Sequence, residues 1–229
     1  GSTDDSEQII SSFTDPRIRY IAVGSNKGLI NALNTGIEAA TGKYLARMDA
    51  DDICVPERLA VQKEWLDKNS AVTVLASRVE FIDENDQPSG NWKEDIQADS
   101  AKPIRRMLPV TNCIAHPSVM LRTDVAKKYR YNPWQKHIED YDLWLRLAAD
   151  GKGIDKTESV LLLYRIHSQS ITGKHLKPGN VFFRLFHCKR KFLYHRLAAG
   201  RFNFFDIRVF FCMIIDLIKA VLKAIKRSV

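Results

Sequence analysis

The sequence predicts an α/β sandwich over residues 1–180, followed by a C-terminal amphipathic helical extension over residues 181–229. Helical and extended patterns alternate through residue 165, as in layered α/β domains. The composition is that of a globular protein, with 45% hydrophobic and 27% charged residues. Beyond residue 181 the chain becomes aromatic, aliphatic and basic. A length of 229 residues therefore fits one main core, large enough for a cleft, plus an appendage.

The first half of the chain predicts helix, strand and helix in that order. Apolar residues at helical spacing predict a helix over residues 28–40, which Thr41-Gly42 can end. Residues 43–48 read as a short strand that leads into a group of acids. Pro56 can occupy the first turn of a helix that runs to about Asn69. Ligands of open α/β sheets gather at the carboxyl ends of strands, so these acids lie where chemistry is expected.

The middle of the chain continues the alternation. One helix is predicted over residues 139–150, with acids in its first turn and Gly151 beyond its end. Turn-forming residues predict a surface loop at 83–90. Three further segments read as strands: residues 71–76, 117–122 and 158–164.

The tail carries the basic charge of the protein. Residues 181–229 contain eleven Lys and Arg against two acids, a local charge of +9, whereas residues 1–180 carry −1 of the total of +8. Asp206, Arg208 and Asp216 disfavour a membrane-spanning helix over residues 204–229 and favour an amphipathic helix in the membrane interface. The alternatives are a solvated basic helix, or a helix packed on the core or on a second subunit.

The cysteines indicate a reducing compartment. None of the four, at positions 54, 113, 188 and 212, forms a C-x-x-C pair or follows a metal-finger or disulfide spacing. No secretory signal pattern is visible at the N-terminus. We expect a cytoplasmic protein, peripheral on the inner face of the plasma membrane, whose basic tail meets an anionic surface and which does not bind nucleic acid.

Asp49-Ala50-Asp51 forms a D-x-D arrangement, which Asp52 extends to three carboxylates in four positions. Oxygen-rich acid clusters suit Mn²⁺ or Mg²⁺, which complete their coordination with water and phosphate oxygens. A metal bound there could bridge a nucleotide diphosphate and act as a Lewis acid. Taken alone, the motif is weak, because acids in a solvated turn are commonplace and explain most such motifs.

The surroundings of the D-x-D motif are similar to those of the family 2 glycosyltransferases over about residues 1–172. The matching segments are Asn26-Lys27-Gly28, Asn31 to Ile37, Ala40 to Tyr44, Met48 to Asp52, and Pro56 to Leu59 with Gln62. The opening Gly1 to Asp5 resembles the end of the family's D-D-G-S-T-D segment. Family members carry a strand and a helix ahead of that segment. The sequence therefore predicts an N-terminally shortened family domain, unless the match at Gly1-Ser2 is accidental.

The resemblance implies a GT-A fold, Rossmann-like, and transfer of a sugar from a nucleotide donor, UDP-linked by expectation. It implies Mn²⁺ or Mg²⁺ as cofactor, with Asp49 and Asp51 as metal ligands. Residues for donor and nucleotide binding are Asn26, Gly28, Asn31, Arg47, Asp49 and Arg165.

Glu139-Asp140-Tyr141-Asp142-Leu143-Trp144 resembles the family's E-D motif, in which the aspartate is the general base of inverting transfer. A sugar hydroxyl is a poor nucleophile, and a nearby carboxylate can remove its proton as it attacks the anomeric carbon. The resemblance assigns catalysis to Asp140 with Glu139, and Trp144 to the acceptor side. The alternative is that both acids only stabilise the N-terminus of a helix.

Two histidines complete the predicted site. Residues 164–170 resemble a family segment that approaches the diphosphate or metal, so His167 is a candidate metal ligand and Arg165 a candidate phosphate partner. His116 resembles a family position near the acceptor cleft, and a hydrogen-bonded core histidine explains it equally well.

The segment from Asn112 to Arg122 and the E-D motif look most like bacterial enzymes of O-antigen (lipopolysaccharide) or capsule polysaccharide biosynthesis. The implied acceptor is a saccharide linked to a polyprenyl diphosphate. Three alternatives stay open: a phosphoryl-transfer enzyme with its own D-x-D, a membrane-surface scaffold, and an inactive fragment that only binds nucleotide sugar.

Overall fold

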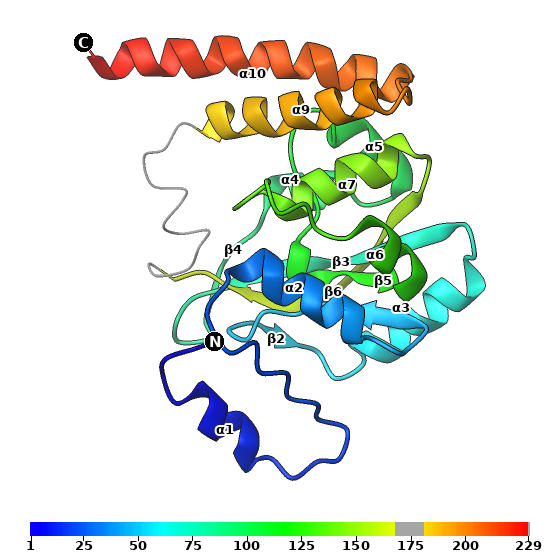
Figure 1. Ribbon diagram of the computed structural model, residues 1–229, viewed down its shortest axis with the longest axis vertical. Coiled ribbons are helices and arrows are strands. Elements are labelled where there is room, and N and C mark those ends of the chain that lie inside the picture. Colours follow the sequence, from blue (N-terminus) through cyan, green and yellow to red (C-terminus); the bar gives the residue numbers. More distant parts are fainter. Residues whose placement is uncertain (168–180, 229) are drawn as a thin grey trace.

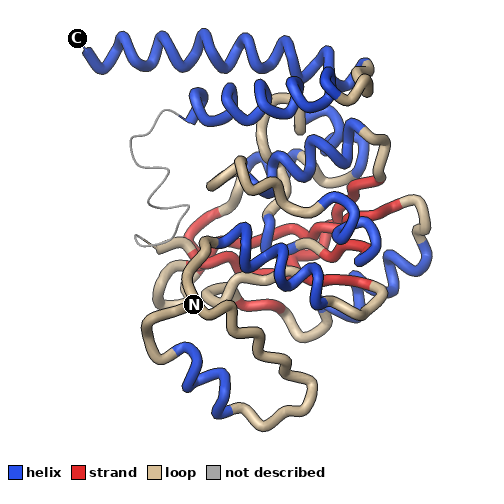
Figure 2. Tube along the Cα trace, viewed as in Figure 1, coloured by secondary structure: helices blue, strands red, loops and turns tan. Residues whose placement is uncertain are grey.

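The computed structural model describes residues 1–167 and 181–228, with side chains described to residue 225. Helices and strands follow one another in a mixed α/β arrangement (Figures 1 and 2). The helices are α1 (Ser6–Ser12), α2 (Leu29–Ala39), α3 (Arg58–Lys68), α4 (Lys93–Gln97), α5 (Ala101–Met107), the 3-10 turn η1 (His116–Ser118), α6 (Thr123–Tyr129), α7 (Glu139–Ala149), α9 (Val181–Ala198) and α10 (Phe204–Ser228). The strands are β1 (Tyr44–Ala46), β2 (Ile53–Cys54), β3 (Val72–Ile82), β4 (Pro88–Gly90), β5 (Met120–Arg122) and β6 (Gly153–Arg165).

The strands form one sheet in the order β1-β5-β3-β6-β2, with β4 paired to β3. The long strands β3 and β6 run parallel at its centre, with Leu75 opposite Asp155 and Phe81 opposite Tyr164. The remaining pairs are antiparallel. Because β6 pairs with β2 on its other side, the carboxyl end of β6 lies beside the loop that joins β1 to β2.

Helix α7 is the centre of the main core. Nine of its eleven residues are buried, including Tyr141 and Trp144. The same hydrophobic cluster contains Val74 of β3, Ile37 of α2 and Phe192 of α9, so α7 lies between the sheet and the C-terminal helices (Figure 1). Helix α3 has its own smaller cluster, in which Leu66 contacts residues of β3 and β5.

The C-terminal region is a hairpin of two antiparallel helices (Figure 1). Helix α9 packs against α7, and α10 lies along α9 as the outermost element. Lys189 of α9 donates to Asp216 of α10 at 2.6 Å, and both side chains are buried. Arg196 of α9 pairs with Asp206 at 3.2 Å at the other end of the hairpin. Within the described residues no helix is long and apolar enough to cross a membrane.

The α/β class with a helical C-terminal extension is confirmed. The predicted helices at 28–40, 56–69 and 139–150 match α2, α3 and α7 to within a few residues. Strands β3 and β6 are each longer than predicted, and the predicted strand at 117–122 is a 3-10 turn followed by the three-residue strand β5. Helices α1, α4, α5 and α6 were not predicted, because their short patterns carry weak periodicity, and α9 lies in the predicted helical extension although its limits were not predicted.

Residues 13–28 contain no helix or strand, and α1 buries none of its residues. Ile9, Phe13 and Ile21 are exposed. This N-terminal part lies apart from the sheet (Figure 2).

Candidate functional site

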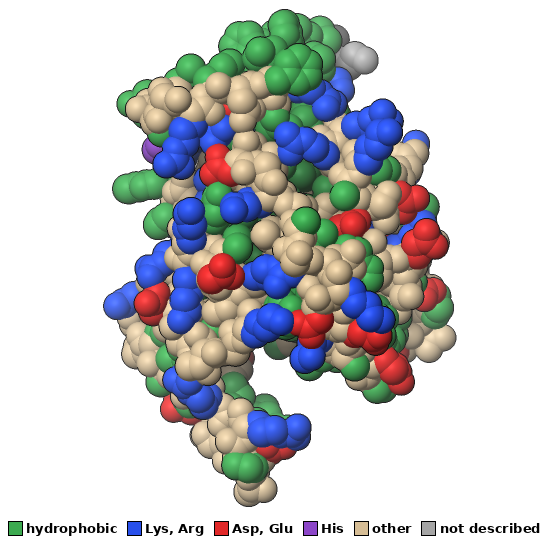
Figure 3. Space-filling view, turned by 90° about the vertical axis from the view of Figure 1, so that its right-hand side faces the viewer, with side chains coloured by type: hydrophobic (Ala, Val, Ile, Leu, Met, Phe, Trp, Pro, Cys, Tyr) green, Lys and Arg blue, Asp and Glu red, His purple; other side chains and the backbone are tan. Residues whose placement is uncertain are grey.

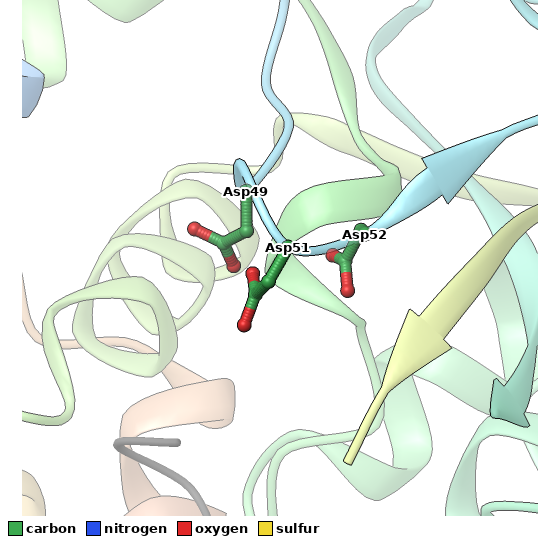
Figure 4. Close-up of side chains that lie close together, drawn as sticks. All are labelled: Asp49, Asp51 and Asp52. Atoms are coloured by element: carbon green, nitrogen blue, oxygen red, sulfur yellow. The ribbon is translucent and has the colours of Figure 1, made fainter. Parts of the chain in front are cut away.

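Three carboxylates gather in the loop between β1 and β2. Asp49, Asp51 and Asp52 each offer an oxygen, and these ligand atoms lie within 4.8 Å of one another. Figure 4 shows that all three side chains come from this one loop, which leaves β1 and enters β2. Asp49 is half-buried, Asp51 exposed and Asp52 buried. The cluster predicted from the sequence is therefore also a cluster in space.

The chemistry of this cluster fits a hard divalent cation. All three groups are carboxylates, the ligand type that Mg²⁺ and Mn²⁺ prefer. The Oδ2 atom of Asp52 is buried and has no hydrogen-bond partner in the described part of the chain. Burial raises the pKa of Asp52 to about 6, although the backbone N–H of Arg165 opposes the rise. Such an unpartnered carboxylate oxygen is stabilised by a bound cation, since a buried anion without a partner is costly.

Arg47, two residues before the first acid, already neutralises part of this charge. Its guanidinium donates two hydrogen bonds to the Asp49 carboxylate, at 2.6 and 2.5 Å, and its side chain is buried. Burial raises the pKa of Asp49, and the Arg47 charge opposes the rise. In this structure the guanidinium of Arg47 therefore binds a carboxylate of the cluster.

Arg58 and Gln62 of α3 hold the backbone at the start of this loop. Arg58 is buried and donates to the carbonyl of Arg47 at 2.7 Å and to the side chain of Gln62 at 3.1 Å. Gln62 donates in turn to the carbonyls of Leu75 and Ser118, at 3.2 and 2.8 Å. These two polar side chains satisfy a carbonyl just after β1, one within β3 and one shortly before β5, which explains why a cation and an amide lie in the interior.

The carboxyl end of β6 reaches the same cluster. The backbone N–H of Arg165 donates to Asp52 Oδ1 at 2.9 Å, and its guanidinium donates to the carbonyl of Asp51 at 2.7 Å. His167 lies with Nε2 at 3.2 Å from Asp51 Oδ2. Arg165 also pairs with Asp86 at 2.6 Å, so in this structure it organises the loop rather than presenting a free guanidinium.

The second predicted acid pair begins α7. Glu139 is buried and Asp140 is half-buried. The side-chain amide of Asn112 donates to Asp140 Oδ2 at 2.8 Å. Burial raises the pKa of Asp140 to about 6, and the Glu139 carboxylate adds to the rise. The Asn112 amide and the Arg47 charge oppose it. A carboxylate with such a pKa accepts protons readily near neutral pH.

Arg47 connects the two acid groups electrostatically. Its charge opposes the burial-driven rise in the pKa of Asp49 in the cluster, and likewise that of Glu139 and Asp140. The D-x-D cluster and the E-D pair, about 90 residues apart in the sequence, therefore share Arg47 as a charged neighbour.

Both predicted acceptor-side residues lie in the interior. Trp144 is fully buried in the main core, and His116 is buried beside it, with ring centroids 6.2 Å apart. His116 Nε2 lies 2.6 Å from the Tyr131 hydroxyl. Burial lowers the pKa of His116 well below its ordinary value, so the ring is neutral. Trp144 thus has no surface through which to contact an acceptor in this structure. His116 has the burial and the hydrogen bond expected of a core histidine.

Asn26, Gly28 and Asn31 lie at the start of α2. The side chain of Asn26 accepts a hydrogen bond from the backbone of Gly28 at 3.0 Å, and Gly28 has a φ of 84°. Asn31 is exposed, and its carbonyl accepts from Thr35 at 2.9 Å. These described hydrogen bonds are local, so the donor-binding role of the three residues stays a prediction. The predicted segment 164–170 lies outside the described residues beyond His167.

Sequence reasoning missed the groups that support Asp140. Asn112 itself is oriented, since its Oδ1 accepts from the backbone of Ile114 at 3.2 Å and only its NH₂ faces Asp140. The neighbouring Cys113 carbonyl accepts from Lys156 at 2.9 Å, and the fully buried Lys156 is paired with Asp95 at 2.7 Å. No local pattern signals this pair, because Lys156 stands between Asp155 and Thr157, ahead of the apolar run predicted as a strand.

The fold is that of the GT-A glycosyltransferases. The structure is similar to a crystal structure of S. aureus TarS residues 1–349, with a TM-score of 0.61 and 15% identity, over 86% of this chain and 54% of that chain. Residues 1–130 match the family model described as glycosyl transferase family 2. The chain belongs to this family, as its motifs predicted.

Curated relatives agree with the family. An uncharacterised glycosyltransferase of Methanocaldococcus jannaschii is 35% identical over 164 residues, which cover 70% of this chain and 55% of the relative. The O-antigen biosynthesis glycosyltransferase WbnJ of Escherichia coli is 34% identical over 61% of this chain and 54% of its own length. The amylovoran biosynthesis glycosyltransferase AmsE of Erwinia amylovora is 31% identical, over 66% and 55%. This chain spans about half the length of these relatives.

Proposed function

We propose that the protein is a metal-dependent, inverting glycosyltransferase that moves a sugar from a nucleotide donor, UDP-linked by preference, to a hydroxyl of a lipid-linked saccharide in bacterial surface polysaccharide synthesis. The observation that carries this proposal is the presence of two acid groups whose pKa values both respond to the charge of Arg47. One is a carboxylate cluster suited to a cation, and the other contains a carboxylate whose pKa of about 6 suits a base.

Asp49 and Asp51 would hold the divalent cation, with Asp52 and His167 beside it. All three carboxylate oxygens converge within 4.8 Å, and His167 lies 3.2 Å from Asp51, which supports this ligand set. When bound, Mn²⁺ or Mg²⁺ supplies charge that stabilises the departing diphosphate. Arg58 and Gln62 keep the loop in place through the Arg47 carbonyl, so the ligands are oriented before the donor arrives.

Asp140 would act as the base. It removes the proton of the acceptor hydroxyl while the hydroxyl oxygen attacks the anomeric carbon from the side opposite the diphosphate, which inverts that centre. The Asn112 amide lowers the pKa of Asp140 and keeps its carboxyl group in one orientation. Glu139, buried beside it, raises the pKa of Asp140 and so makes it a better proton acceptor.

The acceptor proposal rests on the relatives. WbnJ is named for O-antigen biosynthesis and AmsE for amylovoran biosynthesis, so both belong to polysaccharide assembly. A polyprenyl-diphosphate-linked saccharide is an acceptor of the expected chemistry. Its lipid lies in the cytoplasmic leaflet, which would bring the enzyme to the inner face of the plasma membrane.

The proposal is tested by sugar transfer with the Asp140→Asn variant. Asparagine keeps the size and the hydrogen-bonding position of the side chain but cannot accept the proton. We expect transfer to fall by at least a hundredfold, while metal-dependent binding of UDP persists at the parent level. Transfer at the parent rate would show that Asp140 is not the base, and Asp124→Asn, an exposed acid in α6, is the matched control.

A further inference from the structure

Helix α10 has its apolar side outward. In an amphipathic surface helix the apolar stripe normally packs against the protein. Here the residues that face α9 include both acids of the helix, Asp206 and Asp216, together with Val209, Met213 and Ala220. The residues exposed to solvent are large and hydrophobic: Phe204, Ile207, Phe210, Phe211, Ile214, Ile215, Ile218, Val221, Leu222 and Ile225.

Buried ion pairs fix this orientation of the helix. Asp216 accepts from Lys189, which also donates to the carbonyl of Val110 at 2.9 Å. Asp206 is fully buried and pairs with Arg196, which also contacts Asp150 at the end of α7. Rotating α10 to bury its apolar side would carry Asp206 and Asp216 into solvent. Lys189 and Arg196 would then be buried without partners, which is costly. The outward apolar side is therefore a stable feature of the fold.

The exposed side is a broad surface rather than a narrow seam. At roughly 100° per residue, the residues from Ile207 to Ile225 named above cover an arc of about 140° along the helix. Figure 3 shows hydrophobic side chains gathered at the top of the molecule, where α10 lies, with Lys and Arg below them. A contiguous exposed apolar patch of this kind marks a site of association.

Basic residues follow one edge of this surface. On the same helical projection Arg208, Lys219 and Lys223 lie between the apolar side and the stripe that faces α9. Lys219 and Lys223 lie over the ring of Phe182, at 5.3 and 6.0 Å from its centroid, which holds their charges at this edge. Near the first turn of α10, Arg105 and Arg208 line a cavity of about 310 Å³ together with Phe204. A wide apolar side with a cationic edge complements the acyl chains and anionic headgroups of a lipid bilayer.

We propose that the outward side of α10 is the docking surface for an anionic lipid bilayer. The helix lies flat, with Phe210, Ile214 and Ile218 immersed in the boundary between headgroups and acyl chains and with its basic edge on lipid phosphates. This inference deepens the proposed function, since it rests on a lipid-linked acceptor at the membrane. It agrees with the expected interfacial helix and adds its orientation, because the charge pairs of α10 face the protein and its apolar residues face the bilayer.

The test is co-sedimentation of the whole chain with vesicles, without donor or acceptor. We expect binding to vesicles that contain phosphatidylglycerol, at least tenfold weaker binding to phosphatidylcholine alone, and weakening by salt. The double variant Ile215→Asp, Ile218→Asp should bind at least tenfold more weakly than the parent. Ile96→Asp in α4 is the matched control, since Ile96 is 42% exposed and Ile215 48%, and it should bind like the parent.

Two results would overturn the docking surface. One is vesicle binding by the double variant at the parent level with an unchanged melting temperature. The other is a parent chain that does not bind phosphatidylglycerol vesicles. If that parent also forms a dimer in sedimentation velocity that the double variant loses, the surface belongs to a second copy. Neither result bears on the transfer chemistry, because Asp140→Asn tests that chemistry separately.

Discussion

Replacing Asn112 by alanine should raise the pKa of Asp140. The amide of Asn112 donates to Asp140 Oδ2 at 2.8 Å, a hydrogen bond that stabilises the charged form of the carboxyl group. Hydrogen bonds to charged groups contribute about 1.5–3 kcal/mol, and a change of about 1.4 kcal/mol corresponds to one pH unit. Water that enters the space left by the side chain replaces part of the bond. We therefore expect the midpoint to rise by about one pH unit from its value of about 6.

The assay is a pH titration of the Asp140 carboxyl carbon by NMR, which needs no substrate. The sign of the expected change is upward, since removal of a donor disfavours the carboxylate. In a transfer assay the same variant should lose rate in mildly acid buffer and recover it at alkaline pH, where Asp140 is again ionised.

The control is Asn34→Ala. Asn34 is also half-buried and bonds the backbone of Tyr131 in both directions, at 2.9 Å, without touching Asp140. It should destabilise the fold and leave the Asp140 titration unchanged. An Asp140 midpoint that does not move in Asn112→Ala would refute the positioning of the base by Asn112.

Two further variants test the scaffold around the site. Lys189→Met removes the buried partner of Asp216 and should lower the free energy of unfolding by about 3 kcal/mol in urea titrations. Burial raises the pKa of Asp216, and without Lys189 to oppose it the acid stays neutral more readily, so the loss should be smaller in mildly acid buffer than at neutral pH. An equal loss of unfolding free energy in mildly acid and in neutral buffer would contradict this account. Gly28→Ala should cost about 1 kcal/mol in melting experiments, because its φ of 84° strains an L-residue although the space around it is open, and a neutral effect would argue against that backbone conformation.

Much of the fold follows from local patterns in the sequence. Helices α2, α3 and α7 have apolar periodicity and end signals at or near their observed limits, so they were predicted closely. Strands β3 and β6 extend beyond their apolar runs because each continues the parallel pairing with the other, which no local pattern encodes. Helix α9 lies in the predicted helical extension, but its limits were not predicted, because its buried Lys189 and Arg196 interrupt the apolar pattern.

The candidate site was predicted only where its residues are neighbours in the sequence. The acids of the D-x-D motif are neighbours in sequence, so their clustering in one loop could be read from their spacing. The contact of His167 with Asp51 and that of Asn112 with Asp140 join residues far apart in the chain, and both depend on how β6 and α7 pack. The resemblance assigned Trp144 to the acceptor side, and the structure buries it in the main core, because the apolar face of α7 points to the sheet and to α9.

The outward side of α10 shows a limit of helical patterns. The sequence indicates an amphipathic helix but does not say which side meets the protein. Partners on α9 decide that, because Lys189 and Arg196 require Asp216 and Asp206. The burial cost of unpaired charges outweighs the usual preference of the apolar side for the core.

The central claim is that Asp49, Asp51 and their neighbours form a metal-dependent site for a nucleotide diphosphate, and calorimetric titration of UDP tests it most directly. UDP is titrated into the parent chain with Mn²⁺ and with EDTA, and into Asp51→Ala and the control Asp124→Ala. The account predicts binding that requires Mn²⁺, is lost in Asp51→Ala and is kept in Asp124→Ala. Binding that is equal in EDTA, or equal in Asp51→Ala, or absent under all conditions would contradict it.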